Sequence, residues 1–313
     1  MPGYLVRRIL ATLPVMGIVA VIIFSLLRLT PGDPAAVIAG DLASPEQLET
    51  IRQRLGLNEP IPLQLLLWIG QLLRGDLGES IISGVPVASM IADRLGPSAA
   101  LGTGTILFSI LVAVPLGVIA AWRRGTGLDR AVMAFSVLGF SVPTFVKGYV
   151  FILLFAIVLT WLPVQGYSPL SSGLWPFVER LILPTLVLSM GYIALISRIT
   201  RTSVLEVMNE DYIRTARAKG IKERAVLTRH ALRNAAVPIV TIIGVGVGML
   251  LSGVVVIESV FNLPGLGRLV VESVLARDYP VVQGLILFFA LVYILINLLV
   301  DVIYTVIDPR IRY

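Results

Sequence analysis

The sequence predicts an all-α, polytopic membrane protein with six transmembrane helices. Of its 313 residues, 57% are hydrophobic and only 14% are charged, and the mean hydropathy is +0.91. So few polar residues cannot cover a soluble globule of this size. The apolar residues gather in long runs, and basic residues flank these runs unevenly, as the positive-inside rule expects of membrane spans.

The first apolar run, Ile9–Leu27, is uncharged, and its 19 residues would cross about 30 Å at about 1.5 Å per residue. We expect it to remain as a span, because no clear cleavage site follows it. The other predicted spans are Ser98–Ala121, Ala131–Leu162, Leu181–Ser197, Ala235–Ile257 and Val281–Val300. The run Ala131–Leu162 is too long for one straight span, and Pro143 and Lys147 interrupt it. We predict an interfacial start followed by a kinked span.

Six spans place both termini on the same side of the membrane. Sixteen of the 25 basic residues then fall on that side: Arg7, Arg8, Arg123, Arg124, Arg130, Arg310, Arg312 and the nine from Arg198 to Arg233. Because basic loops stay inside, we predict a multi-pass inner (plasma) membrane protein whose N- and C-termini are cytoplasmic.

Residues 30–97 are predicted to form a small helical insertion outside the membrane. Pro31-Gly32-Asp33-Pro34 reads as a turn. Ser44-Pro45-Glu46-Gln47 reads as a capping box that opens a helix ending near Leu55. Further helices are expected over Pro62–Arg74 and Pro86–Leu95. The predicted division is therefore 1–29 for the N-terminus and first span, 30–97 for the insertion and 98–313 for a core of five spans.

A basic island, Asp211–Pro238, lies between two of the spans. Its basic residues are Arg214, Arg217, Lys219, Lys222, Arg224, Arg229 and Arg233. We expect Asp211 to cap a helix over Tyr212–Lys219 and Gly220 to end it in a left-handed turn. A second helix, Lys222–Ala235, should follow. On charge alone, a solvated loop beside the membrane would account for this composition.

The island resembles the cytoplasmic coupling loop of importer permeases in the ATP-binding-cassette (ABC) class, most closely the dipeptide/oligopeptide branch. Arg214-Thr215-Ala216 stands where the wider class has Glu-Ala-Ala, and the spacing from Gly220 to Pro238 is longer than in sugar importers. Both differences fit the peptide branch. Further segments similar to that branch are Leu29–Pro34, Phe261–Arg268, Arg277–Val281 and Asp308–Tyr313, so the resemblance covers nearly the whole chain.

The resemblance implies that this coupling loop (residues 198–237) docks its short helix into a cleft on an ATPase subunit. The coupling residues would be Asp211, Tyr212, Arg214, Thr215, Ala216, Arg217, Ala218, Lys219 and Gly220. The implied partners are a second homologous permease in a heterodimer, two ATP-binding subunits and an extracytoplasmic substrate-binding protein. The residues expected to meet the binding protein are Asp33, Pro264, Gly265 and Asp278. ATP and Mg²⁺ would be bound by the ATPase subunits.

The sequence lacks the residues that several other functions would require. No cysteine is present and His230 is the only histidine, so thiolate and histidine-rich metal sites are excluded. None of the three lysines follows a glycine, so there is no phosphate-binding loop, and we expect this chain to bind no ATP and no other cofactor. Gly244-x-Gly246-x-Gly248 lies within a span and favours close helix packing. The net charge of +6 lies beside the spans, which argues against nucleic acid and leaves membrane lipid as the surrounding partner.

Four ionisable residues lie in or beside the spans. Arg28, Glu258 and Asp301 are near enough to span ends to reach water by snorkelling. Lys147 lies deeper, and either faces a water-filled path or partner subunit or snorkels inward. Lys147, Pro143 and Glu258 are therefore the candidate residues of a translocation path. No catalytic cluster of side chains is evident, so we expect no enzyme activity.

The prediction is a permease subunit that forms the translocation path by alternating access and imports di- or oligopeptides. Importers of glutathione or nickel chelates share this permease type and stay open as alternatives. An ion-coupled secondary transporter is more distant, because inverted repeats and midplane carboxylates are not clear in the sequence. A channel or scaffold would not need a folded basic loop.

Overall fold

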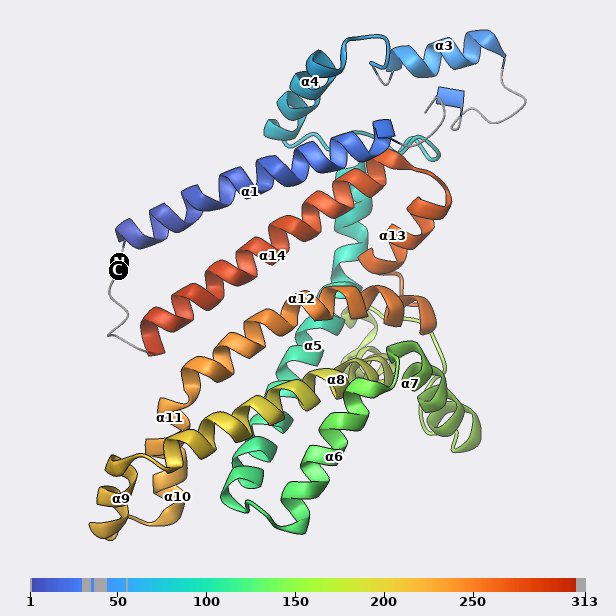
Figure 1. Cartoon of the computed structure of the whole chain (residues 1–313). Helices are drawn as coiled ribbons and strands as arrows, with labels where there is room; N and C mark the ends of the chain where they lie inside the picture. The colour runs from blue at the N-terminus through green and yellow to red at the C-terminus, as the bar shows by residue number, and fades with distance from the viewer. Residues whose placement is uncertain (1, 30–34, 37–43, 55, 308–313) are drawn as a thin grey trace. The chain divides into compact units, whose positions relative to one another are not determined.

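The computed structural model describes residues 2–29, 35–36, 44–54 and 56–307, and these are largely helical (Figure 1). The main helices are α1 (Pro2–Leu29), α3 (Pro45–Arg54), α4 (Ile61–Leu73), α5 (Val87–Trp122), α6 (Gly127–Ser141), α7 (Thr144–Phe151), α8 (Leu174–Met208), α9 (Asp211–Ala218), α12 (Ala236–Val260), α13 (Leu266–Leu275) and α14 (Tyr279–Ile307). The chain divides into two compact units. One comprises Met1–Gly96 and Arg268–Leu295, and the other comprises Pro97–Gly267 and Ile296–Tyr313.

Several of these helices can cross a membrane. Within the described residues, four are long and apolar enough: Val87–Trp122, Leu174–Met208, Ala236–Val260 and Tyr279–Tyr304. A bent pair, Gly127–Ser141 and Thr144–Val158, would make a fifth span if it is counted as one. The apolar part of α1, Leu10–Ser25, is shorter. The prediction of a helical protein with several spans is confirmed, and the count of six stays a prediction.

The predicted break before the second span is wrong. Helix α5 runs without interruption from Val87 to Trp122, where the sequence predicted one helix ending at Leu95 and a span starting at Ser98. Pro97 lies inside α5, as does Pro115. A proline removes one backbone donor, and membrane helices tolerate this loss where neighbouring groups satisfy the freed carbonyl. The helix therefore continues through Gly96 and Pro97.

The predicted kink at Pro143 is a complete break. Helices α6 and α7 are bent by 104°, and Val142 and Pro143 between them are extended, with ψ of 126° and 143°. Proline disfavours helical backbone in the residue before it, which accounts for the position of the break. A π-helical segment, η1 (Ile152–Val158), follows α7.

The unit that contains the N-terminus holds two predicted features of the insertion. The capping box is confirmed, because the Ser44 N–H donates to Gln47 Oε1 at 2.9 Å and the Gln47 N–H donates to Ser44 Oγ at 3.3 Å. Helix α4 lies close to its predicted bounds. The predicted turn over residues 31–34 lies outside the described residues. In the same unit α1 lies beside α14 (Figure 1), and Ala20 and Ile23 of α1 pack against Leu287 of α14.

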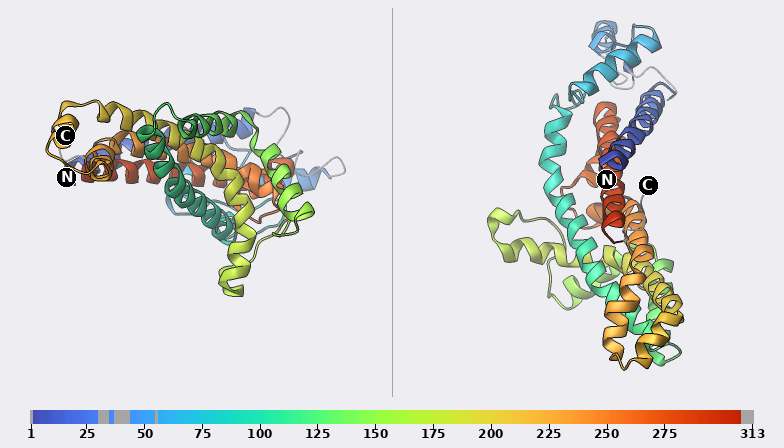
Figure 2. Two further views of the ribbon diagram at one scale, coloured as in Figure 1. Left: turned by 90° about the horizontal axis from the view of Figure 1, so that it is seen from below. Right: turned by 90° about the vertical axis from the view of Figure 1, so that its left-hand side faces the viewer.

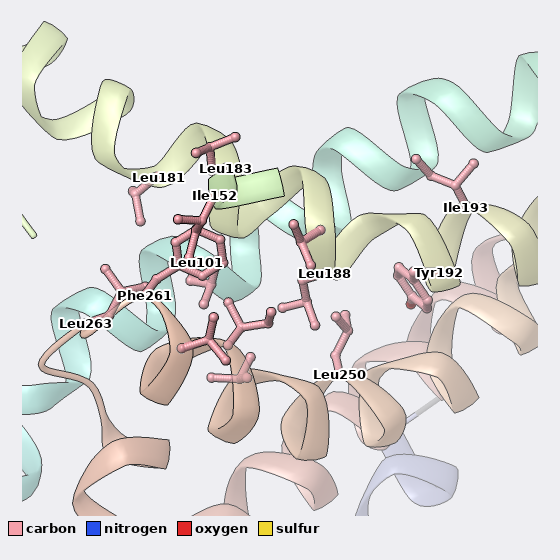
Figure 3. Close-up of a cluster of buried hydrophobic side chains, with 14 of the residues drawn as sticks. Leu101, Ile152, Leu181, Leu183, Leu188, Tyr192, Ile193, Leu250, Phe261 and Leu263 are labelled. Carbon is pink, nitrogen blue, oxygen red and sulfur yellow. The ribbon is translucent and has the colours of Figure 1, made fainter. Parts of the chain in front are cut away.

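The core of the other unit lies between α5, α8 and α12 (Figure 3). Its fully buried members include Leu101, Leu183, Ile257, Phe261 and Leu263. Close packing around this core depends on glycines. A Cβ at Gly244 would lie 2.7 Å from a methyl of Val300, and a Cβ at Gly246 would overlap the ring of Tyr192. The packing role predicted for these two glycines is confirmed.

Gly117 allows α5 to approach α8 closely. A Cβ there would lie 2.6 Å from Thr200 Cβ and 2.7 Å from the carbonyl oxygen of Ser197. Because a backbone atom cannot rotate away, Gly117→Ala should push the two helices apart and cost about 1–3 kcal/mol. We expect a lower Tm of the detergent-solubilised protein. The control is Gly102→Ala on the same helix, where nothing lies within 4 Å of the added Cβ. Equal Tm values for the two variants would contradict this packing.

Candidate functional site

The coupling loop folds as a compact helical knob between α8 and α12 (Figures 1 and 2). Helix α8 extends past the predicted span end to Met208, and α9 begins at Asp211. Gly220 then separates α9 from a second helical run of α10 (Glu223–Ala225), a π-helical turn η3 (Val226–Ala231) and α11 (Leu232–Asn234). The two predicted helices around a glycine turn are confirmed, although the π-helical turn was not predicted.

Helix α9 stands on an apolar base. Ile213, Ala216 and Val226 are buried together, and Val207 and Met208 from the end of α8 pack against them. The spacing of Ile213 and Ala216 puts both on one helix face. Ala216, expected among the coupling residues, thus lies inside the loop's own core rather than on its exposed face.

The predicted cap by Asp211 is wrong. Glu210 occupies the N-cap position, and its side chain makes no capping hydrogen bond. Asp211 is the first helical residue, and its carboxylate pairs with Arg214 at 3.1 Å. From inside the helix it can still interact favourably with the partial positive charge of the N-terminus.

The other end of α9 is fixed as predicted. Gly220 has φ of +75°, its N–H donates to Arg217 O at 2.9 Å, and the Ile221 N–H donates to Ala216 O at 3.2 Å. These two bonds form a Schellman motif, and Ile221 adds the apolar contact that accompanies it. The left-handed backbone favours glycine here, and crowding does not, because nothing lies within 4 Å of an added Cβ.

A two-bond ion pair holds α9 to the helix that follows. Arg217 Nη2 and Nε donate to the two oxygens of Glu223 at 2.7 Å and 3.2 Å, and this contact raises the pKa of Arg217. With Ile213 and Ala216 buried, the exposed residues of the α9 segment are Asp211, Tyr212, Arg214, Thr215, Arg217, Ala218, Lys219 and Gly220. Tyr212 is 42% exposed. The exposed surface of the loop is therefore mainly basic and includes one aromatic ring.

Glu258 does not snorkel to water as predicted, because its side chain is fully buried. Ser98 Oγ donates to Glu258 Oε1 at 2.5 Å and accepts the Leu266 N–H at 2.7 Å. A Cβ at Gly265 would overlap the Glu258 carboxylate, and one at Gly267 would lie 3.0 Å from its Oε2. Glu258 therefore organises the loop after α12, and no sequence pattern indicates its contact with Ser98.

The residues expected to meet a binding protein differ in how far they are exposed. Asp278 is buried, and its carboxylate accepts hydrogen bonds from Ser80 Oγ at 2.5 Å and the Ile81 N–H at 3.2 Å. Gly265 is also buried, and Pro264 is partly exposed. Asp33 lies outside the described residues. Asp278 thus shapes the start of α14 from inside its own unit.

Lys147 lies on α7, four residues after Pro143, and its side chain reaches back across the break to the end of α6. Its side chain is buried, and Nζ donates to the carbonyl oxygen of Gly139 at 2.9 Å. A cation at the C-terminal end of α6 satisfies a carbonyl that the break leaves open and complements the helix dipole. Pro143 causes the break, and Lys147 bonds to the carbonyl that the break exposes. Neither sequence interpretation of this lysine included such a capping role.

A largely buried ion pair between α6 and α8 was also not predicted from the sequence. Arg201 of α8 donates two hydrogen bonds to Asp129 of α6, at 2.5 Å and 2.8 Å. The Gly125 N–H adds a third to Asp129 at 2.9 Å. Thr126 three residues before Asp129 resembles a capping box, and this local signal could have suggested where α6 begins.

Within the part of the chain that the structure describes, no group of three or more acidic or histidine side chains could hold a metal ion.

Comparison with known proteins decides the family. Residues 113–313 match the family described as the binding-protein-dependent transport system inner membrane component, and residues 1–101 match the N-terminal family of the same membrane component. The chain belongs to this family. It is a membrane-spanning permease subunit of the ABC transporter class, and the resemblance found in the sequence is confirmed.

Full-length relatives agree with this assignment. A "probable peptide ABC transporter permease protein" of Sinorhizobium fredii is 52% identical over 310 residues, which cover 99% of both chains. The glutathione transport system permease protein of Escherichia coli K12 is 44% identical over 313 residues, all of both chains. An inward-facing structure of the MetNI methionine ABC transporter shares the fold, with a TM-score of 0.60 at 17% identity over 71% of this chain and 97% of that one.

The left-handed turn gives a direct test of the coupling loop. Gly220→Val should cost about 1–2 kcal/mol, because a β-branched residue resists this conformation, and α9 should lose its fixed end. We expect normal membrane insertion but weak binding of ATPase subunits or hydrolysis without import, measured as uptake and ATP hydrolysis in reconstituted vesicles. Gly220→Asn is the control, since asparagine tolerates the left-handed region. Wild-type uptake and hydrolysis in Gly220→Val would show that the turn is an ordinary loop.

Proposed function

We propose that the chain imports di- or oligopeptides, driven by ATP hydrolysed on partner subunits. The observation that carries this substrate class is the full-length relative at 52% identity, whose name specifies peptide transport. Peptides vary in side chain and share a backbone, which suits a weakly selective path with tight recognition on a separate binding protein. This chain would form part of the path and contribute no chemistry.

The exposed surface of α9 supports a coupling role. Asp211, Tyr212, Arg214, Thr215, Arg217, Ala218, Lys219 and Gly220 face outward, while the apolar base formed by Ile213, Ala216 and Val226 ties α9 to α8. A rigid loop of this kind can transmit the movement of a partner subunit to the membrane spans. Closure of the ATPase pair would move α9 and α8 together, and the path would open to the side where the binding protein docks.

The complete importer would contain this chain, a second homologous permease, two ATP-binding subunits and an extracytoplasmic binding protein. ATP and Mg²⁺ would be held by the ATPase subunits, because this chain lacks a glycine-lysine phosphate loop. Lys147, Pro143 and Glu258 shape the break and the loop described above, so we propose that they affect the path through its shape. Pro264 is the one partly exposed described residue of the expected binding-protein contacts.

Glutathione is the second candidate substrate, because a relative at 44% identity over the full length is named for glutathione transport. Glutathione is itself a tripeptide, so a path for short peptides could accept it. The two candidates differ in what the binding protein selects more than in what the permease requires.

Uptake by the assembled complex decides between them. Vesicles containing the permease pair, ATPases and binding protein should accumulate a labelled dipeptide or pentapeptide when ATP is supplied on the ATPase side. We expect excess unlabelled peptide to compete more strongly than glutathione. Preferential glutathione uptake would move the assignment to the second candidate, and uptake without ATP would contradict the ABC mechanism.

The proposed topology has six spans, cytoplasmic termini and residues 30–97 outside. The chain contains no cysteine, so single cysteines report their side cleanly. Gln53→Cys should react with an impermeant thiol reagent in intact cells, and Lys222→Cys should react only after the membrane is opened. Labelling of Lys222→Cys in intact cells would reverse the proposed orientation.

A further inference from the structure

Helices α6 and α8 are fastened together at three levels along their length. Near one end lies the two-bond ion pair of Asp129 and Arg201. In the middle, Ser136 Oγ and Ser197 Oγ are 3.3 Å apart, and both side chains are buried. Near the other end Gly139 contacts α8 directly, since a Cβ there would lie 3.1 Å from both Ala194 Cβ and the Met190 carbonyl oxygen. Figure 1 labels the two helices.

The ion pair fixes geometry as well as distance. Asp129 is almost completely buried, and Arg201 is about one-fifth exposed. A guanidinium that donates two bonds to one carboxylate sets the angle between the groups. Breaking a buried pair leaves a charge without its partner, which is strongly unfavourable. Relative sliding of α6 and α8 at this level would break both bonds, so the pair resists such movement.

The fastened helices connect two functional parts of the unit. Arg201 lies about two turns before the end of α8, where Val207 and Met208 pack beneath α9. At its far end, α6 stops at the break before Pro143, where Lys147 caps the Gly139 carbonyl. A displacement of the coupling loop can therefore reach the broken span through α8 and α6.

We propose that Asp129 and Arg201 are positioning residues for import: they make α6 move with α8 as one rigid body, so that movement of the coupling loop reaches the α6–α7 break. This inference rests on the proposed function. Flexure then occurs at Val142 and Pro143, where the helix is interrupted by extended backbone, and not along the α6–α8 contact.

A disulfide between the two helices tests rigidity directly. In the cysteine-free chain, Ser136→Cys with Ser197→Cys places two thiols where the hydroxyl oxygens are now 3.3 Å apart. We expect the oxidised complex to import at the rate of the reduced complex and of each single-cysteine variant. Loss of uptake on oxidation and its return on reduction would show that α6 slides on α8 and would overturn the inference. Failure of the pair to form a disulfide would contradict the packing on which it rests.

Charge variants test the ion pair itself. Asp129→Asn and Arg201→Gln should keep the ATPase subunits and ATP hydrolysis but lower the substrate imported per ATP by about fivefold or more, the lower range of measured coupling between sites. Exchanging the charges, Asp129→Arg with Arg201→Asp, should recover part of that ratio. The control is Arg130→Gln, which removes an exposed charge beside Asp129 and should leave the ratio unchanged.

The other outcomes separate the competing explanations. An unchanged import ratio in both single variants would overturn the positioning role. So would a parallel loss of assembly, hydrolysis and uptake without recovery in the exchanged variant, because this pattern marks a general role in folding. A wild-type complex that hydrolyses ATP and imports neither peptide nor glutathione would instead contradict the proposed function.

Discussion

Polar groups inside an apolar helical bundle need partners from the protein, because the membrane interior supplies no water. Three contacts in the larger unit meet this requirement. The Lys147 ammonium bonds to a carbonyl at the break between α6 and α7, Glu258 accepts the Ser98 hydroxyl hydrogen, and Asp129 binds Arg201. Each contact lies where a helix starts, stops or breaks. The irregular points of the fold are therefore held by specific hydrogen bonds, while apolar packing fills the regular parts between them.

The coupling loop differs from the membrane core, because most of its polar groups face outward. It keeps its apolar residues few and inward, and most of its charges face outward. Ile213 and Ala216 seat α9 on α8, while the Schellman turn at Gly220 and the pair of Arg217 with Glu223 fix its far end. A short helix isolated in water would be marginal. These contacts hold α9 in a fixed position on the end of α8.

Features that depend on local chemistry could be predicted from the sequence. The capping box at Ser44, the break at Pro143 and the left-handed turn at Gly220 each follow from what one residue permits the backbone to do. Errors of one or two residues arose where neighbours compete, as for Glu210 and Asp211 at the start of α9. The continuity of α5 through Pro97 depends on packing around the helix, which the local pattern does not contain.

Contacts between distant parts of the chain could not be predicted. Asp129 and Arg201 are 72 positions apart, and Ser98 and Glu258 are 160 apart. The local sequence around these residues does not indicate a partner so far away along the chain. Ala216 matched the coupling motif, yet its direction is set by Val226 across the turn. The motif indicated where the coupling loop lies, but only the fold shows which of its residues are exposed and which are buried against α8.

The central claim is that the outward face of α9 meets the ATPase subunit while its inward face does not. Cysteine-specific crosslinking in the assembled complex measures this directly, with single cysteines introduced at Ala218, which is exposed, or at Ala216, which is buried. The account predicts a crosslink to the ATPase subunit from position 218, changing in yield when ATP is bound, and none from position 216. Equal crosslinking from both positions, or crosslinking from position 216 alone, would contradict it.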